Sequence, residues 1–153
     1  MSFFTLRTPW DMLEKAKREH ARMEQRIDID SVFNFFVTAY HIRDYVKHDG
    51  TVSQQALESF LKDPDIQACR DLCDKGKHLV LTKRPDPRAD YTEFSGCFGG
   101  APIGVLPLGA GSVEYWTFSS DSRSVDVKSL ADAILVKWTE FLRNHGCCLT
   151  NKE

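Results

Sequence analysis

The segment from Ser31 to His48 constrains the fold most, because its side chains are apolar around most of a helix. An amphipathic helix needs only one apolar stripe, whereas a helix that is apolar on nearly every side packs against neighbours in several directions. Asp30 or Ser31 can cap its N-terminus, and Gly50 can end it. The sequence therefore predicts a central helix over residues 31–47.

Four further helices are predicted from capping signals and apolar periodicity, at residues 9–26, 53–62, 64–76 and 126–145. Thr8 followed by Pro9 is typical of a helix start, since proline's missing N–H has no partner to lose there. Gly76 is a natural end for the helix over 64–76. The last helix, capped by Asp126 or Ser124, carries a stripe expected to face the core: Leu130, Ile134, Trp138, Phe141 and Leu142.

Between the fourth and last helices, at about residues 78–118, the pattern changes to short apolar runs with many glycines and prolines. Strands are expected at 78–82, 103–108 and 112–118, with a glycine-containing hairpin turn at 108–111. A turn-rich loop is expected at 83–90, because each proline removes a donor from a strand ladder, and another turn over 121–124. The predicted fold class is α+β, mainly α: about four bundled helices and a small antiparallel β hairpin element before the C-terminal helix.

The 153 residues and 17.5 kDa suit one domain, residues 1–153. The net charge is -2, which disfavours a polybasic nucleic-acid-binding surface but leaves a local RNA site open. No stretch approaches the roughly 18 apolar residues of a membrane-spanning helix, and residues 1–7 are too short for a secretory signal. The sequence therefore predicts a protein without membrane contact.

Five cysteines form an odd set, which indicates reduced thiols and a cytoplasmic location. Cys69 and Cys73 share a helix face, but a zinc site would need further ligands and no second close pair completes it, so small buried thiols and no metal are expected. Cys97 lies among glycines whose N–H groups could stabilise an oxyanion, but no partner histidine is identifiable for a cysteine nucleophile. No cofactor is predicted.

One row of polar side chains follows the otherwise apolar central helix. Asn34, Thr38, His41, Tyr45 and His48 recur at spacings of four and three residues, which places them along one narrow line. Buried polar groups need partners, since each unsatisfied group costs about 1–3 kcal/mol. This polar row therefore faces a ligand-binding or catalytic groove, an internal polar network, or solvent.

The fourth helix carries a second set of polar residues near its end. Arg70, Asp74 and His78 follow one another at four-residue intervals, and Lys77 adds a cation. If they face the polar row, they would give an anion of phosphate size two donors and a histidine able to transfer a proton near neutral pH. The alternative is an ordinary surface ion pair between Arg70 and Asp74.

Near the end of the central helix, Arg43 and the polar Asp44 are followed shortly by His48. This pattern resembles the Arg…His motif of the HEPN superfamily, helical proteins that include many metal-independent ribonucleases. The resemblance implies that Arg43 contacts an RNA phosphate and that His48 assists attack of the 2′-hydroxyl, usually across a dimer. The glycine-rich β region departs from the usual HEPN bundle.

The segments 35–45 and 69–78 also resemble a group of bacterial helical proteins that carry an aromatic-rich stretch and a terminal Lys-His pair. That resemblance implies no activity, but it favours Lys77 and His78 over Arg43 as site residues.

Three functions remain open from the sequence. The first is a small cytoplasmic bacterial protein of binding or accessory type, in a defence or phage-related system. The second is a HEPN-like ribonuclease that uses Arg43 with His48, or Arg70 with His78. The third is a small-molecule or nucleotide binder in a groove between the second and fourth helices. RNA, a protein partner and a second copy of the chain all remain open as partners.

Overall fold

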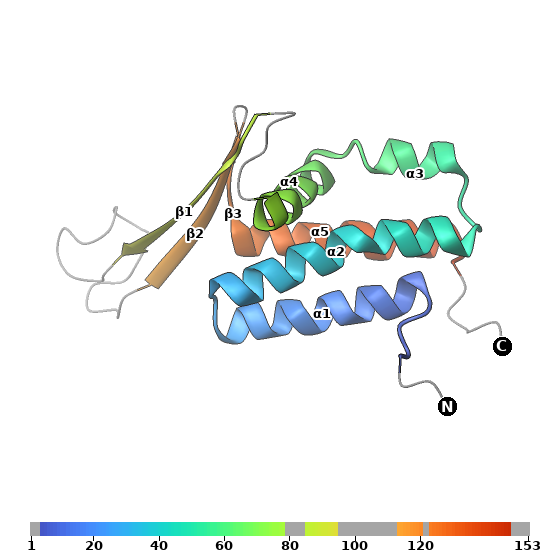
Figure 1. Ribbon diagram of the computed structural model, residues 1–153, viewed down its shortest axis with the longest axis horizontal. Coiled ribbons are helices and arrows are strands. Elements are labelled where there is room, and N and C mark those ends of the chain that lie inside the picture. Colours follow the sequence, from blue (N-terminus) through green and yellow to red (C-terminus); the bar gives the residue numbers. More distant parts are fainter. Residues whose placement is uncertain (1–3, 79–84, 95–112, 121–122, 148–153) are drawn as a thin grey trace.

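The computed structural model describes residues 4–78, 85–94, 113–120 and 123–147 (Figure 1). Over these residues the elements follow in this order: α1 (Pro9–Gln25), α2 (Ile29–Asp49), α3 (Gln54–Phe60), α4 (Pro64–His78), β1 (Arg88–Phe94), β2 (Val113–Ser120), β3 (Arg123–Asp126) and α5 (Val127–Asn144). The predicted fold class is confirmed: the protein is α+β and mainly α, with a small antiparallel sheet before the C-terminal helix.

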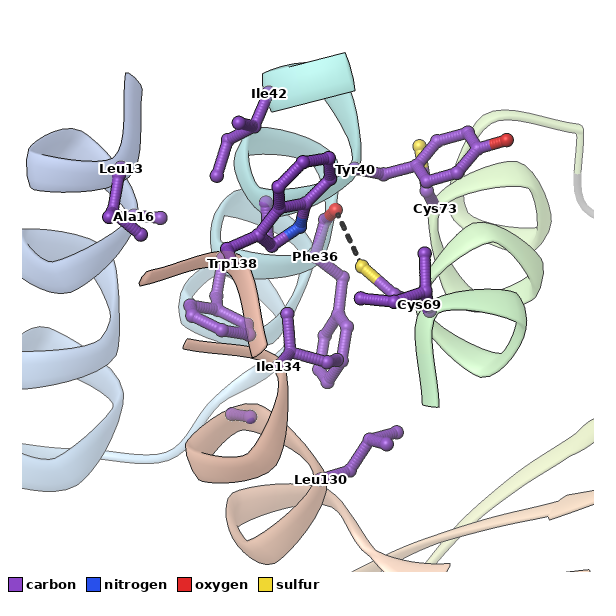
Figure 2. Packing of buried hydrophobic residues seen from close by; sticks show 14 of the residues in the cluster. Leu13, Ala16, Phe36, Tyr40, Ile42, Cys69, Cys73, Leu130, Ile134 and Trp138 are labelled. Atoms are coloured by element: carbon purple, nitrogen blue, oxygen red, sulfur yellow. Dashed lines mark hydrogen bonds between the residues drawn. The ribbon is translucent and has the colours of Figure 1, made fainter. Parts of the chain in front are cut away.

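Helix α2 is the centre of the helical layer, as its apolar circumference predicts. It packs against α1, α4 and α5 (Figure 1). The core stripe of α5 lies among these helices, and Trp138 and Phe36 are 0% and 1% exposed. Figure 2 shows Trp138, Ile134 and Leu130 of α5 close to Phe36 of α2. Burial of these large side chains provides the main stabilisation of the bundle.

Capping residues set the helix starts. At α1, Thr8 accepts a hydrogen bond from the Asp11 N–H, and Asp11 accepts one from the Thr8 N–H, as the sequence predicts. The predicted cap of α2 is wrong: the cap is Asp28, not Asp30 or Ser31. Asp28 accepts from the Ser31 N–H while the Ser31 hydroxyl accepts from the Asp28 N–H, so the two satisfy each other and the helix begins earlier.

The predicted end of α4 at Gly76 is also wrong, because the helix continues to His78. A Cβ built on Gly76 would lie 2.5 Å from Cδ2 of Phe33 and 2.7 Å from its Cε2. Gly76 therefore does not end the helix. It allows the aromatic ring of Phe33 on α2 to rest against the backbone of α4.

The three strands form one antiparallel sheet in the order β1-β2-β3. Tyr91 of β1 is opposite Trp116 of β2, and Ser119 of β2 is opposite Ser124 of β3. The strand predicted at 112–118 is confirmed as β2. The loop predicted over 83–90 is wrong at its end, since β1 begins at Arg88, after the last proline.

The turn predicted over 121–124 is wrong from Arg123, which begins β3 because its backbone pairs with β2. The strand predicted at 78–82 is wrong at His78, which is the last residue of α4, and its other residues lie outside the described part of the chain. The strand predicted at 103–108, the hairpin turn at 108–111 and the nucleophile hypothesis at Cys97 lie outside it as well.

A network of ion pairs joins α4 to α5 and β3. Nζ of Lys137 lies 2.6 Å from a carboxylate oxygen of Asp63 and 2.8 Å from one of Asp65, while Nη1 of Arg123 lies 2.6 Å from Asp65. The Asp63 carboxylate also accepts hydrogen bonds from the first N–H groups of α4, those of Asp65 at 2.9 Å and Ile66 at 3.4 Å. The network therefore holds the start of α4 against β3 and α5.

Candidate functional site

A cluster of polar side chains occupies the seam between α2 and α4. Nδ1 of His41 lies 2.7 Å from the Val37 carbonyl, and its Nε2 lies 3.0 Å from Nζ of Lys77. A carbonyl only accepts and an ammonium group only donates, so this network assigns the proton to Nδ1 and leaves Nε2 as an acceptor. Lys77 therefore joins the polar row of α2 to α4 through His41.

Arg43 lies in the same seam and is held by neighbours on its own helix. Its guanidinium carbon is 4.1 Å from the ring centroid of Tyr40, and its Nη1 donates to the Tyr40 hydroxyl. Its Nε is 3.4 Å from a carboxylate oxygen of Asp44, and this nitrogen is buried without the geometry of a hydrogen bond to any described residue. The guanidinium therefore packs along α2.

Tyr40 connects this arginine to α4. Figure 2 shows its ring extending from α2 over α4, next to Cys73. Burial raises the pKa of the Tyr40 phenol, while the positive charges of Arg43 and Arg70 act in the opposite direction and the charge of Asp74 adds to the rise. The phenol is therefore neutral at physiological pH and acts as a hydrogen-bonding group. Arg70 is itself paired with Asp71, at 3.0 Å.

The two cysteines of α4 are inert thiols. Cys69 and Cys73 are both 0% exposed, and Sγ of Cys69 donates to the Phe36 carbonyl (Figure 2). Burial raises the pKa of Cys69 well above its ordinary value, and burial raises the pKa of Cys73 although Lys77 acts against it. Neither thiol is a thiolate near neutral pH, so neither is an activated nucleophile.

The other residues of the polar row have different surroundings. Thr38 is buried and accepts a hydrogen bond from Nζ of Lys15 on α1, at 2.9 Å. Tyr45 is half-buried against the core, whereas Asn34 and His48 are exposed. The polar row thus lies between α1 and α4. Lys15 reaches it from α1, and Lys77 reaches it from α4.

Of the ten residues singled out from the sequence, the structure gathers five in the seam between α2 and α4: His41, Arg43, Arg70, Asp74 and Lys77. His78 is the last residue of α4 and is exposed. Much of the gathered charge is used in pairs with neighbouring carboxylates, so the seam has the character of a structural polar network.

A cavity lies at the other end of α2, between the helical layer and the sheet. Its volume is about 380 Å³. Apolar and aromatic side chains of α2, α4, β2 and α5 supply most of its lining, among them Phe33, Phe36, Leu72, Trp116 and Val127. Phe36 is fully buried and forms part of the floor, whereas Phe33 is 37% exposed and stands at the edge. A space of this size and composition suits a small organic molecule.

Three polar residues complete the lining: Lys75 of α4, Asp90 of β1 and Thr117 of β2. Nζ of Lys75 lies 2.9 Å from a carboxylate oxygen of Asp86, so this cation is already paired. None of the three was singled out from the sequence. The cavity depends on pairing between β1 and β2 and on the place of the sheet beside α2, and neither leaves a local signal in the sequence.

The described part of the chain contains no group of three or more His, Cys, Asp or Glu residues placed to bind a metal ion. None of its helices is both long enough and apolar enough to cross a bilayer. Comparisons of the chain with family models, with curated proteins and with solved structures found no match. The function proposed below is therefore inferred from the geometry of the site.

Proposed function

We propose that this protein binds a small, mainly apolar molecule in the cavity between α2, α4 and the sheet. The observation that supports the proposal is the cavity itself, which has a volume of about 380 Å³ and is lined by aromatic and aliphatic side chains with few polar groups. Ligand sites are typically concave, mostly apolar and furnished with a small number of orienting polar groups. The proposal agrees with a binder between the second and fourth helices, although the lining residues differ from the predicted ones.

The wall of the cavity also supports a binding role. A glycine inside a helix is less stable than alanine by roughly 0.5–1 kcal/mol, and Gly76 lies inside α4. The ring of Phe33 occupies the space where a Cβ of Gly76 would stand. The chain therefore gives up local helix stability at a position where an aromatic ring closes one edge of the cavity.

The ribonuclease hypothesis receives less support from the contacts of its residues. It requires Arg43 to bind an RNA phosphate, but the guanidinium lies over Tyr40 and beside Asp44. His48 is exposed near the end of α2. These contacts favour a structural role for Arg43, so the binding function is the one we propose.

Phenylpropanol is a suitable first probe, since it has an aromatic ring, a short apolar chain and no charge. A ligand that binds only the folded state raises the apparent stability by mass action. We expect saturating phenylpropanol to raise the melting temperature and to change the fluorescence of Trp116, which lines the cavity.

Two tryptophan substitutions separate cavity binding from nonspecific effects. Ala89→Trp places a large ring at the cavity, because Ala89 is an exposed lining residue of β1. Ala21→Trp makes the same change at an exposed position of α1 that is not part of the lining. The proposal requires the probe to stabilise wild type and Ala21→Trp but not Ala89→Trp. Equal stabilisation of all three proteins, or of none, would contradict it.

A further inference from the structure

Among the residues that the structure describes, the charged groups at the cavity are mostly acidic. Asp90 lines it directly, and the one lysine in its lining, Lys75, is neutralised by Asp86 at 2.9 Å. A third carboxylate, that of Glu114, lies beside the wall, where its Oε2 accepts a hydrogen bond from Nε1 of Trp116 at 3.2 Å. Since Lys75 and Asp86 neutralise each other, the carboxylates of Asp90 and Glu114 leave an excess of negative charge among the described residues at this apolar space.

The aromatic rings of the cavity reinforce this character. Phe33, Phe36 and Trp116 come from two different layers of the fold and line the same space. The face of an aromatic ring is negative and attracts cations within about 6 Å, most strongly for tryptophan. Donation of the Trp116 N–H to Glu114 draws electron density toward the indole and strengthens this attraction.

We infer that the ligand of this cavity is an organic cation, an amine or quaternary ammonium compound with an apolar body. The inference rests on the binding function proposed above and specifies its ligand class. The apolar body would lie against the aliphatic and aromatic floor, and the cationic head would lie toward Asp90 and the faces of the rings.

An anionic ligand fits the same cavity less well. It would have to displace Asp86 from Lys75, and it would face Asp90 across the space. Arg88 lies two residues before Asp90 on β1, but it lines a different hollow, together with Pro85 and Ser119. The arrangement of charges therefore favours a cation.

Three probes with nearly the same body and different charges test this ligand class: phenylpropylamine, phenylpropanol and phenylpropionate. Isothermal titration calorimetry on the wild-type protein measures the affinity of each. We expect the amine to bind about tenfold more tightly than the alcohol, and the carboxylate to bind most weakly. An alcohol that binds as tightly as the amine, or a carboxylate that binds most tightly, overturns the inference and leaves the binding function intact. If none of the three binds, the proposed function itself fails.

A matched pair of substitutions locates the charge. Asp90→Asn keeps the size of the side chain and removes the carboxylate from the cavity lining. Asp132→Asn makes the same change on α5, where the exposed carboxylate pairs with His20 and does not line the cavity. We expect Asp90→Asn to weaken amine binding about threefold, and to weaken it more than it changes alcohol binding. Equal amine affinities for wild type, Asp90→Asn and Asp132→Asn would overturn the assignment of Asp90.

Discussion

Gly76→Ala tests whether the ring of Phe33 needs the bare backbone of α4. The new Cβ would lie 2.5 Å from Cδ2 and 2.7 Å from Cε2 of that ring, closer than carbon atoms approach without repulsion. Gly76 belongs to the hydrogen-bonded backbone of α4, whereas Phe33 is 37% exposed and its ring can rotate outward. The expected response is that the ring leaves the wall of the cavity.

Two opposing contributions determine the stability change. Alanine is favoured over glycine inside a helix by about 0.8–1 kcal/mol. Complete burial of a phenylalanine side chain stabilises a fold by about 1.5–3 kcal/mol. Because Phe33 is only partly buried, expulsion of its ring would lower the free energy of unfolding by up to about 1–2 kcal/mol. Gly76→Ala is therefore expected to change the free energy of unfolding of the wild type only slightly, or to lower it by up to about 1 kcal/mol.

A double-mutant cycle with Phe33→Ala makes the test decisive. Without the ring there is no clash, so Gly76→Ala in that background should stabilise the protein by the full helix-propensity gain of about 0.8–1 kcal/mol. Urea denaturation followed by circular dichroism measures all four proteins, provided that the denaturant dependence stays constant. If Gly76→Ala stabilises both backgrounds equally, the ring does not rest on Gly76 and the proposed wall of the cavity is wrong.

Three further predictions concern the core, a helix cap and the ion-pair network. Trp138→Ala should lower the free energy of unfolding by about 3–5 kcal/mol. Trp138→Phe should cost less, since it keeps an aromatic ring and removes an indole N–H that meets no acceptor among the described residues; an equal loss would contradict this account. Thr8→Ala should cost about 1 kcal/mol in the same denaturation assay through loss of the α1 cap, and an unchanged urea midpoint would argue against the cap. Burial raises the pKa of Asp65, but hydrogen bonds and charges from Lys137 and Arg123 outweigh it and lower the pKa below its usual value. A lowered pKa stabilises the fold above the unfolded-state value of about 3.9, and this contribution disappears as the pH falls through the folded-state value. The urea concentration at the unfolding midpoint should therefore decrease as the pH is lowered below about 4. Asp65→Asn should weaken this dependence on pH, and identical pH profiles for wild type and variant would refute the role of the network.

The parts of the fold that depend on local signals could be predicted from the sequence. Thr8 and Asp126 cap helices where predicted, because a cap is set by residues within one turn. The apolar circumference of α2 and the stripe around Trp138 likewise predict burial without knowledge of the partners. The continuation of α4 past Gly76 could not be predicted from local signals. Gly76 faces the Phe33 ring of a different helix, so the reason for a glycine at this position is a tertiary contact.

The candidate site depends on contacts between different helices and strands, and the local sequence pattern does not specify these contacts. The spacing of the polar row and of Arg70, Asp74 and His78 predicts a polar seam only if the two sets face each other. The contact of His41 with Lys77 crosses this seam, whereas His78 is exposed. The cavity is not predicted because the loop expected at 83–90 takes in the start of β1 and no strand is expected over 91–94, although polar and apolar residues alternate from Arg88 to Thr92. Without β1, the place of Trp116 beside α2 could not be inferred.

The two ends of the described chain meet far from the cavity. Nε1 of Trp10 donates to the Cys147 carbonyl at 2.8 Å, and the Thr51 hydroxyl lies 3.6 Å from Sγ of Cys147, so both ends gather just beyond the C-terminus of α2. The cavity is at the opposite end of this helix, whose 21 residues span about 30 Å. A reporter attached at the exposed Thr51 would therefore lie about the length of α2 away from the cavity and leave it unobstructed.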